Sequence, residues 1–546
     1  MHRIVTLACI VLFCVSESAA ESIRLGNLTP RGSRRVLYLS DPSNTTGQYS
    51  DPTTPEEMRQ WVRALADGGV DTHLQCVFQQ TWSNFYRSDH CEYDARPRHG
   101  RFIPMMDAGI IPLEVLIDES HRQEMEFFAG LGMNDRHGDN KEFFEKNKKW
   151  ELAEFPGSVD YSFPEIRDWM FAIVEELAQG FDVDGIEFTF IRHGHVFPTA
   201  IARQQTSVLT EFMRRIRSML LKEGKARGRH IQFGVRVPQS LEGAAKLGYD
   251  VRNWILQELI DYVAPSDVIY TDFNARYEEF AVLTRATACK LYPTLQPLPC
   301  WNDQVNLLGL DHYRAAVQNF YGAGADGISL FNYQFHWAQK HWDPKRARSY
   351  PGSASNFPDA LQYFHVLKDH RAVLGGNRHY VFYPLWLGAP DRIAHMTTPA
   401  RAILKRSASD QRATYRFRVC EDLPSSAELA TRDGKGRRLL YNRAGKVPGA
   451  WMLFRAIGAG PKDRLAIDIN GHEIAAGGVR RIWYEHGRPM WHGRPLGEYS
   501  EYRFRLTAPP AVYGDNALGL RFVQSGEDST EPVIVDEVEV MVNVPR

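Results

Sequence analysis

The sequence predicts a (β/α)8 TIM barrel followed by an all-β sandwich domain, and two patterns lead to this prediction. Between residue 35 and about residue 370, short runs rich in β-branched residues alternate with amphipathic stretches, which is typical of βα units around a parallel sheet. Beyond about residue 375, short alternating segments are separated by turns such as Asn470-Gly471, which indicates an antiparallel sandwich. A chain of 546 residues also exceeds what one hydrophobic core usually organises.

The elements follow in order along the chain. Barrel strands are predicted at residues 36–39, 71–78, 111–117, 183–190, 231–237, 262–265, 291–295 and 327–331. The clearest helices lie at 55–65, 164–177, 203–222, 251–259, 277–288, 312–321 and 358–368, several with Pro in the first turn. Sandwich strands are predicted at 415–419, 450–454, 464–469, 481–484, 502–506, 517–522 and 533–540. No internal repeat is apparent. Active sites of such barrels lie in the loops after the carboxyl ends of the strands, so functional residues are expected there.

Three segments result: a signal peptide over residues 1–20, the barrel over 21–375 and the sandwich over 376–546. The first segment combines a basic start, an apolar run and Ser18-Ala19-Ala20, which a signal peptidase accepts. Its apolar run is too short to span a bilayer. We therefore expect export to the periplasm or the medium, and no membrane contact once the signal is removed.

The composition of the chain limits the classes of partner and cofactor that are expected. The 65 basic and 66 acidic side chains leave no charge excess to attract nucleic acid, which is not an expected partner. The cysteines beyond the signal peptide are odd in number and lack Cys-x-x-Cys spacing, so buried free thiols are expected, with a Cys289–Cys300 disulfide as the alternative. Nucleophile-elbow, phosphate-loop and dinucleotide motifs are absent from the sequence, and no cofactor is predicted.

The segment 183–193 carries the strongest functional signal. Ile186, Phe188 and Phe190 alternate with Glu187 and Thr189, so a buried strand brings a polar pair into an interior. Burying a carboxylate without hydrogen-bond or charge partners costs on the order of several kcal/mol. A supporting site or a salt bridge is therefore expected around Glu187.

Residues 184–192, Asp-Gly-Ile-Glu-Phe-Thr-Phe-Ile-Arg, resemble the fourth-strand motif of bacterial glycoside-hydrolase-like barrel proteins. The second domain looks like the galactose-binding-like β-sandwiches that accompany such enzymes, which implies either carbohydrate binding or capping of the barrel. The resemblance covers the barrel portion and implies cleavage of O-glycosidic bonds. In this sequence Thr189 stands where the motif has Asp.

Glycosidic cleavage needs two carboxyl groups on either side of the bond. Glu187 is the first candidate, as general acid. Its partner is sought among Asp118, Glu119 and Asp272, with Asp267 near the last of these, because all are predicted to follow barrel strands. The alternative for Glu187 is a salt bridge with Arg236, which the alternation also points into the barrel; the two interpretations are compatible.

Other side chains are candidates for substrate binding because they follow strand ends. They are Arg192, His193, Arg236, Trp82, Trp301, Asn332 and Gln334. Guanidinium and amide groups bind sugar hydroxyls, and indole faces stack on pyranose rings. His193-Gly194-His195 has ligand-like spacing, but no further ligand set accompanies it and no metal is predicted.

The sequence thus predicts an exported glycoside hydrolase-like protein that acts on a poly- or oligosaccharide through paired carboxylates. Two alternatives remain. One is a non-catalytic carbohydrate-binding protein in which Thr189 marks lost chemistry, and the other is a metal-dependent hydrolase. Sugar, linkage and oligomeric state stay open.

Overall fold

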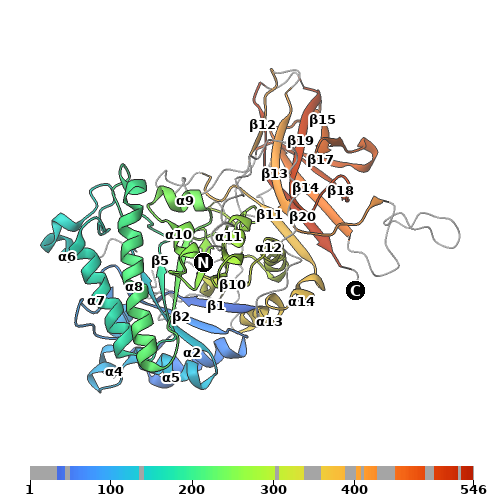
Figure 1. The fold of residues 1–546 in the computed structure, drawn as a ribbon. Helices are drawn as coiled ribbons and strands as arrows, with labels where there is room; N and C mark the ends of the chain where they lie inside the picture. Colours follow the sequence, from blue (N-terminus) through green and yellow to red (C-terminus); the bar gives the residue numbers. More distant parts are fainter. Residues whose placement is uncertain are drawn as a thin grey trace, which may run out of the picture.

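The computed structural model describes residues 34–42, 49–134, 140–301, 307–336, 358–387, 401–407, 411–426, 449–485, 497–526 and 530–544. The first part of the chain forms a barrel surrounded by helices, and the last part forms a β-sandwich beside it (Figure 1). The predicted fold class is confirmed by the strand order. The predicted signal peptide lies outside the described residues.

Parallel strands form the barrel wall. They are β1 (Arg35–Ser40), β2 (Thr72–Gln79), β4 (Glu126–Gly132), β5 (Gly185–Thr189), β6 (Gln232–Pro238), β7 (Tyr262–Ser266), β8 (Lys290–Leu291), β9 (Thr294–Leu295) and β10 (Gly327–Leu330). Their order is β8-β7-β6-β5-β4-β2-β1-β10-β9, and the short β3 (Trp82–Ser83) pairs with β2. Because Pro293 lies between β8 and β9, these two act as one interrupted strand, whose pairs with β7 and β10 close the barrel.

Helices cover the outside of this wall (Figure 1). They are α2 (Pro55–Asp67), α3 (Pro97–Gly100), α4 (Ile103–Asp107), α5 (Pro112–Arg122), α6 (Lys141–Lys146), α7 (Pro164–Gly180), α8 (Thr206–Arg227), α9 (Leu241–Lys246), α10 (Val251–Leu256), α11 (Glu278–Arg285), α12 (Leu310–Gly322), α13 (Tyr363–Leu367) and α14 (His370–Leu374). In α2, Thr54 and Glu57 form a capping box, and Met58, Val62 and Leu65 face the wall.

The strand predicted at 111–117 is wrong, because this segment is helix α5. Pro112 opens the helix, and Leu113, Leu116 and Ile117 share its buried face at helical spacing. The third barrel strand is β4, with the sequence Glu-Phe-Phe-Ala-Gly-Leu-Gly. It contains no β-branched residue and two glycines, so its composition does not resemble that of a strand.

Aspartates fasten alternate strands at the amino end of the barrel. Each of these aspartates directly precedes a barrel strand and contacts the second residue of the strand before it. The aspartate carboxylate accepts a hydrogen bond from the backbone N–H of that residue, and the aspartate N–H donates to the carbonyl of the same residue. The carboxylate contacts are Asp71 with Val36 (2.8 Å), Asp184 with Phe127 (2.9 Å), Asp261 with Phe233 (2.7 Å) and Asp326 with Leu291 (3.0 Å). Asp184, the first residue of the resembling motif, therefore has a role in the fold.

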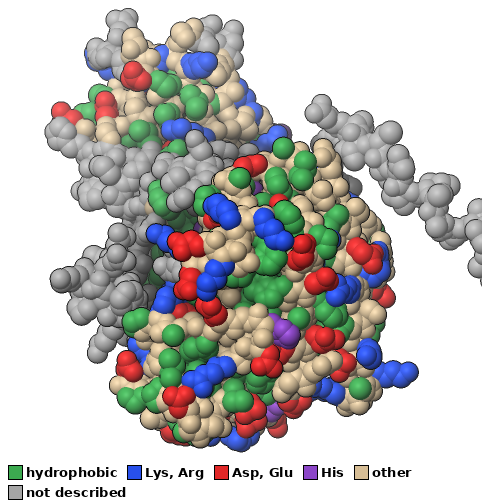
Figure 2. Space-filling model, turned by 90° about the vertical axis from the view of Figure 1, so that its left-hand side faces the viewer, with side chains coloured by type: hydrophobic (Ala, Val, Ile, Leu, Met, Phe, Trp, Pro, Cys, Tyr) green, Lys and Arg blue, Asp and Glu red, His purple; other side chains and the backbone are tan. Residues whose placement is uncertain are grey.

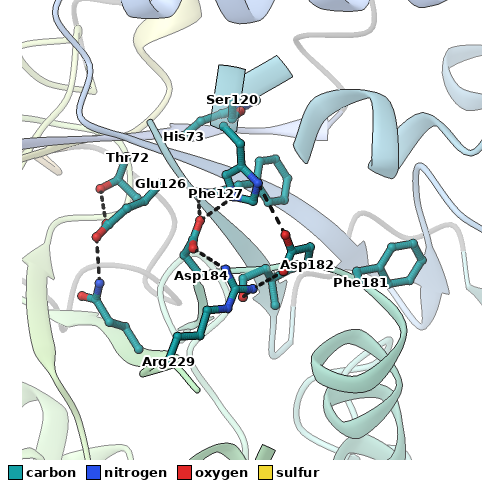
Figure 3. Close-up of polar contacts among 12 residues, drawn as sticks. Thr72, His73, Ser120, Glu126, Phe127, Phe181, Asp182, Asp184 and Arg229 are labelled. Carbon is teal, nitrogen blue, oxygen red and sulfur yellow. Dashed lines mark hydrogen bonds and ion pairs between the residues drawn. The ribbon is translucent and has the colours of Figure 1, made fainter. Parts of the chain in front are cut away.

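Asp184 also binds side chains from neighbouring elements (Figure 3). Its carboxylate accepts hydrogen bonds from His121 Nε2 at 2.8 Å and from Arg229 Nη1 at 2.9 Å. We expect Asp184→Ala to lower the free energy of unfolding by about 1–3 kcal/mol, because the Phe127 N–H loses its partner. Urea denaturation measures this, and Asp182→Ala, which removes a mostly exposed neighbour of Arg229, should cost less than about 1 kcal/mol. Equal losses in both variants would contradict a specific role for Asp184.

The second domain consists of two antiparallel sheets. One has the order β11-β20-β14-β18-β17, with β12 also paired to β20, and the other has the order β13-β19-β15-β16. The strands are β11 (Arg378–Phe382), β12 (Ala402–Leu404), β13 (Ala413–Val419), β14 (Gly449–Ile457), β15 (Arg464–Ile469), β16 (His472–Glu473), β17 (Arg480–Tyr484), β18 (Tyr499–Leu506), β19 (Gly514–Gln524) and β20 (Val533–Asn543).

The two domains meet at α12. The buried Asn319 amide of this helix accepts from the Cys420 N–H and donates to the Arg418 carbonyl, both at 2.9 Å. The Arg378 guanidinium on β11 donates to the Leu374 carbonyl of α14 at 3.0 Å, and the Glu421 carboxylate within the sandwich holds it in place through contacts of 2.6 and 2.8 Å. Specific polar contacts thus hold the sandwich against the barrel.

The surface charges and the cysteine thiols are those of an ordinary globular protein. On the visible face in Figure 2, acidic and basic side chains are interspersed. Within the described ranges, Cys76, Cys91, Cys289, Cys300 and Cys420 are free thiols; the expectation of buried free thiols holds for all except Cys91, which is half-buried. None of the described helices is both long enough and apolar enough to cross a bilayer.

Candidate active site

Glu187 lies inside the barrel and forms an ion pair with Arg236. Neither side chain is exposed at all (0%), and Arg236 Nε and Nη2 lie 3.0 and 3.2 Å from the two carboxylate oxygens of Glu187. The hydroxyls of Tyr262 and Thr189 donate to the same carboxylate at 2.9 and 3.1 Å. The salt bridge anticipated from the alternation is therefore present, and both oxygens of Glu187 are occupied.

Arg236 connects this pair to the far wall of the barrel. Its guanidinium also donates to Thr294 Oγ1 at 2.7 Å and to Ser329 Oγ at 2.8 Å. The Tyr262 ring has room because β6 carries Gly234, where an added Cβ would lie 1.9 Å from that ring. The network thus links β5, β6, β7, β9 and β10 across the interior.

A pocket opens above this network at the carboxyl ends of β1, β2, β4, β5 and β10. Asp41, Gln79, Gly132, Thr189, Arg192 and Phe331 are among its lining residues, and it is small and partly open to solvent. We call it the mouth pocket. Thr189 lines it while donating to Glu187, so the carboxylate lies one layer beneath the pocket. This pocket is the first part of the candidate site.

Arg192 lies at the edge of the mouth pocket in a strained conformation. Its φ of 78° falls in the left-handed region, which costs free energy for a residue other than glycine. In this position its guanidinium lies 3.2 Å from the Asp41 carboxylate and donates to Asn332 Oδ1 at 3.0 Å. This backbone conformation therefore places the Arg192 guanidinium across the barrel opening.

Amide side chains continue this network to the opposite wall. Asn332, which is also left-handed with a φ of 55°, donates through Nδ2 to Gln296 Oε1 at 2.9 Å. Gln296 Nε2 in turn donates to the Asp267 carbonyl at 2.6 Å. Arg192 and Asn332, both predicted as site residues, are thus brought together by the fold.

Two carboxyl groups follow β7 on that opposite wall. The buried Asp267 accepts from the N–H groups of Ile269 and Tyr270 at 3.0 Å, and from Trp386 Nε1 at 2.8 Å. The half-buried Asp272 accepts from Gln239 Nε2 at 2.9 Å, at the end of β6. Both therefore lie at the functional end of the barrel.

Burial raises the pKa of Asp267 to about 6, against the lowering effect of its three donors, and the nearby Asp272 charge adds to the rise. Burial also raises the pKa of Asp272. A carboxyl group whose pKa is raised toward neutrality, beside a second carboxyl group, is the usual arrangement for acid–base catalysis. This pair is the second part of the candidate site.

Aromatic rings enclose Asp267. Trp386, from the segment after β11, lies with its ring centroid 4.7 Å from that of Tyr270 and 6.1 Å from that of Trp301. Trp301, predicted to bind substrate, donates its backbone N–H to the Leu385 carbonyl at 2.7 Å and keeps part of its side chain exposed. The low polarity of this cluster explains why burial dominates the pKa of Asp267.

Two predicted acids lie elsewhere. Asp118 and Glu119 belong to α5, which leads into the amino end of β4, so their expected place after a strand is wrong. The Asp118 side chain is 66% exposed, and Glu119 accepts from Arg122 Nη1 at 2.8 Å. The fold does not bring either one to the mouth pocket.

The remaining predicted binding residues differ in accessibility. One face of Trp82 is covered by the Arg96 guanidinium, 4.4 Å from the ring centroid. Gln334 is buried in the turn after β10, and His193 is half-buried beside Arg192. His195 stacks on Phe155 with a centroid distance of 3.7 Å. Within the described ranges, no group of three or more His, Cys, Asp or Glu side chains could hold a metal ion.

Comparison with known proteins finds similarity to curated glycosyl hydrolases, although no family model matches the chain. The glycosyl hydrolase DigH of Escherichia coli K12 is 24% identical over 238 residues, which cover 34% of this chain and 52% of that protein. The glycosyl hydrolase YngK of Bacillus subtilis 168 is 25% identical over 284 residues, which cover 44% and 55%. The chain thus spans about half the length of these curated relatives.

Among solved structures, the endo-β-1,4-mannanase of Thermotoga petrophila aligns with a TM-score of 0.41 and 10% identity, over 93% of this chain and 97% of that one. The α-L-fucosidase isoenzyme 2 of Paenibacillus thiaminolyticus aligns with a TM-score of 0.39 and 12% identity, over 61% and 49%. Similarity at this level carries no functional information, and the barrel fold rests on the strand order given above.

Proposed function

We propose that this protein hydrolyses an O-glycosidic bond of a poly- or oligosaccharide at the mouth of the barrel, with Asp267 as general acid and Asp272 as its carboxylate partner. The observation that carries the proposal is the pair itself: two neighbouring carboxyl groups after β7, one with a pKa of about 6. Hydrolysis requires one protonated and one ionised carboxyl group, and the pKa of about 6 lets Asp267 supply the protonated one in weakly acidic solution. The glycosyl hydrolase relatives support the same reaction class.

In this proposal the mouth pocket binds the sugar next to the cleaved bond. Arg192 offers donors to hydroxyl groups, and the hydrogen-bond chain through Asn332 and Gln296 fixes its orientation relative to Asp267. Glu187 is assigned a supporting role, since its oxygens are held by Arg236, Tyr262 and Thr189. We also propose export, on the basis of the signal-like residues 1–20.

The pH dependence of hydrolysis tests the general acid. Asp267 must be protonated to protonate the leaving oxygen, so kcat/KM should fall as the pH rises above about 6. At lower pH the rate should fall again as Asp272 becomes protonated. The measurement is release of reducing ends from neutral and acidic glycans between pH 4 and 9, roughly the range in which carboxyl and imidazole groups titrate. A rate that stays constant or rises above pH 6 would exclude Asp267 as the acid.

A non-catalytic carbohydrate-binding protein is the second candidate. Thr189, which stands where the resembling motif has an acid, favours it, and so does the full hydrogen bonding of the Asp267 carboxylate. Glycan binding in calorimetry without release of reducing ends would establish this second function in place of the first.

A further inference from the structure

The short segment after strand β11 runs from the sandwich to the functional end of the barrel. Strand β11 belongs to the larger sandwich sheet, where it pairs with β20. Directly after β11, the Tyr383 hydroxyl donates to the Glu539 carboxylate on β20 at 3.0 Å. A little further on, the Leu385 carbonyl accepts a hydrogen bond from the Trp301 N–H, in the loop after β9, at 2.7 Å. The segment is therefore attached to both domains.

The next residue of this segment, Trp386, belongs to an apolar cluster that three separate parts of the chain build together. The members of the cluster are Val268 and Tyr270 after β7, Leu298 after β9, and Leu385 and Trp386 after β11. All five side chains are buried. Close packing of this kind keeps a side chain in one rotamer. The direction of the Trp386 indole N–H is therefore fixed by residues of both domains.

The indole N–H of Trp386 binds one oxygen of Asp267, and the turn after β7 binds the other. Oδ1 accepts from the Ile269 and Tyr270 N–H groups at 3.0 Å, both within the turn that Asp267 begins. Oδ2 accepts from Trp386 Nε1 at 2.8 Å. Backbone and indole N–H groups donate and cannot accept a proton. None of these three partners therefore takes up a proton that Asp267 carries, and the proton stays available to an oxygen of the substrate.

We propose that Trp386 is a positioning residue for Asp267, so that a segment of the sandwich domain completes the active site of the barrel. Its indole N–H holds Oδ2 in place, and its ring helps to bury the carboxyl group. These two contributions oppose each other, because a donor stabilises the carboxylate and burial disfavours it. The inference rests on the proposed function, since it takes Asp267 as the general acid.

Titratable groups from two elements interact with Asp267. Burial is the largest influence that raises the pKa of Asp267, and the charge of Asp272 in the same loop adds to it. Tyr277, at the start of α11, also interacts with Asp267, but burial keeps the pKa of Tyr277 well above its ordinary value and the hydroxyl stays neutral. Removing the Trp386 donor while keeping an aromatic ring should therefore raise the pKa of Asp267 beyond about 6.

Trp386→Phe tests the inference, because phenylalanine keeps an aromatic ring in the cluster and removes the N–H. The measurement is the pH dependence of kcat/KM, from release of reducing ends on the glycan that the wild type hydrolyses best. We expect the fall in rate at high pH to move upward by about 0.5–1 pH unit, because a hydrogen bond to a charged acceptor is stronger than one to a neutral acceptor. A role in packing alone would lower the rate and leave the position of this fall unchanged.

The stability of the variant gives a readout that needs no substrate. The pKa of Asp267 in the folded protein, about 6, lies above its ordinary value of 3.8, so its contribution to stability is present at low pH and is lost as the pH rises through the folded value. Trp386→Phe raises the folded pKa further. It should therefore cost more stability at about pH 8 than at about pH 5, on the two sides of this pKa. Urea denaturation at both pH values measures the difference.

Trp254→Phe is the matched control. Trp254 on α10 is fully buried, and its indole N–H donates to Thr210 Oγ1 at 2.9 Å, so this variant loses a buried indole hydrogen bond to a neutral acceptor. The smaller ring should cost the same stability at both pH values. The fall of kcat/KM at high pH should stay where it is in the wild type.

The possible results separate this inference from the proposed function. A Trp386→Phe protein that behaves like Trp254→Phe, with equal losses of stability at both pH values and an unmoved fall in rate, would overturn the positioning role while hydrolysis by the wild type stands. A fall that moves to lower pH would overturn it as well, because the ring and not the N–H would then control Asp267. Absence of hydrolysis by the wild type on every glycan would overturn the proposed function, and the catalytic role of Trp386 with it.

Discussion

Glu187→Gln is expected to lower the free energy of unfolding by about 3–5 kcal/mol, because it leaves the Arg236 guanidinium charged and unpaired inside the barrel. Glutamine has nearly the same shape as glutamate, so the loss reports charge and not a cavity. The Tyr262 and Thr189 hydroxyls, which both donate to the carboxylate, lose a charged acceptor at the same time. Urea denaturation followed by circular dichroism measures the change.

Two further variants make the test specific. Glu242→Gln removes one partner of an ion pair with Arg203 whose side chains are 60% and 63% exposed, and should cost less than about 1 kcal/mol. Adding Arg236→Met to Glu187→Gln should recover part of the stability, because the unpaired charge is then gone. A Glu187→Gln protein with wild-type stability and no hydrolytic activity would instead make Glu187 a catalytic group.

Most of the barrel could be predicted because its strands are short apolar runs between amphipathic helices. The failure at α5 has a physical cause: a segment rich in branched apolar residues suits a strand or the buried face of a helix equally well. Pro112 was the signal for the helix. The real strand β4 has glycines at 130 and 132, and a Cβ added at Gly130 would lie 3.3 Å from the Cys76 backbone of the neighbouring strand. Such a strand depends on its neighbours and not on its own propensity.

Part of the candidate site could be predicted from the order of the barrel strands. Asp272, Arg192 and Asn332 follow strands, so topology alone places them at the right end of the barrel. The importance of Asp267 depends on Trp386, which lies more than a hundred residues further along the chain and buries the carboxylate. Likewise, the role of Asp184 becomes clear only beside Asp71, Asp261 and Asp326, whose shared contact is a property of paired strands.

Asp267→Asn is expected to reduce kcat/KM for the preferred glycan by about 10²- to 10⁴-fold, the usual contribution of a general acid. Asparagine keeps an oxygen that can accept from the Ile269 and Tyr270 N–H groups, so the turn after β7 should survive. It cannot release a proton to the leaving oxygen at any pH. The fall in rate above about pH 6 should therefore disappear along with the activity.

Substrates with different leaving groups distinguish this role from a structural one. An aryl glycoside with an acidic phenol needs little protonation, so Asp267→Asn should lose much less activity on it than on a natural sugar linkage. A variant that is merely misfolded would lose both activities equally. Asp311→Asn, an aspartate at the start of α12 with its side chain 48% exposed, serves as the control and should leave both rates unchanged. Undiminished hydrolysis of the natural linkage by Asp267→Asn would remove the acid from the proposed mechanism, since proton transfer to the leaving oxygen would then need another group.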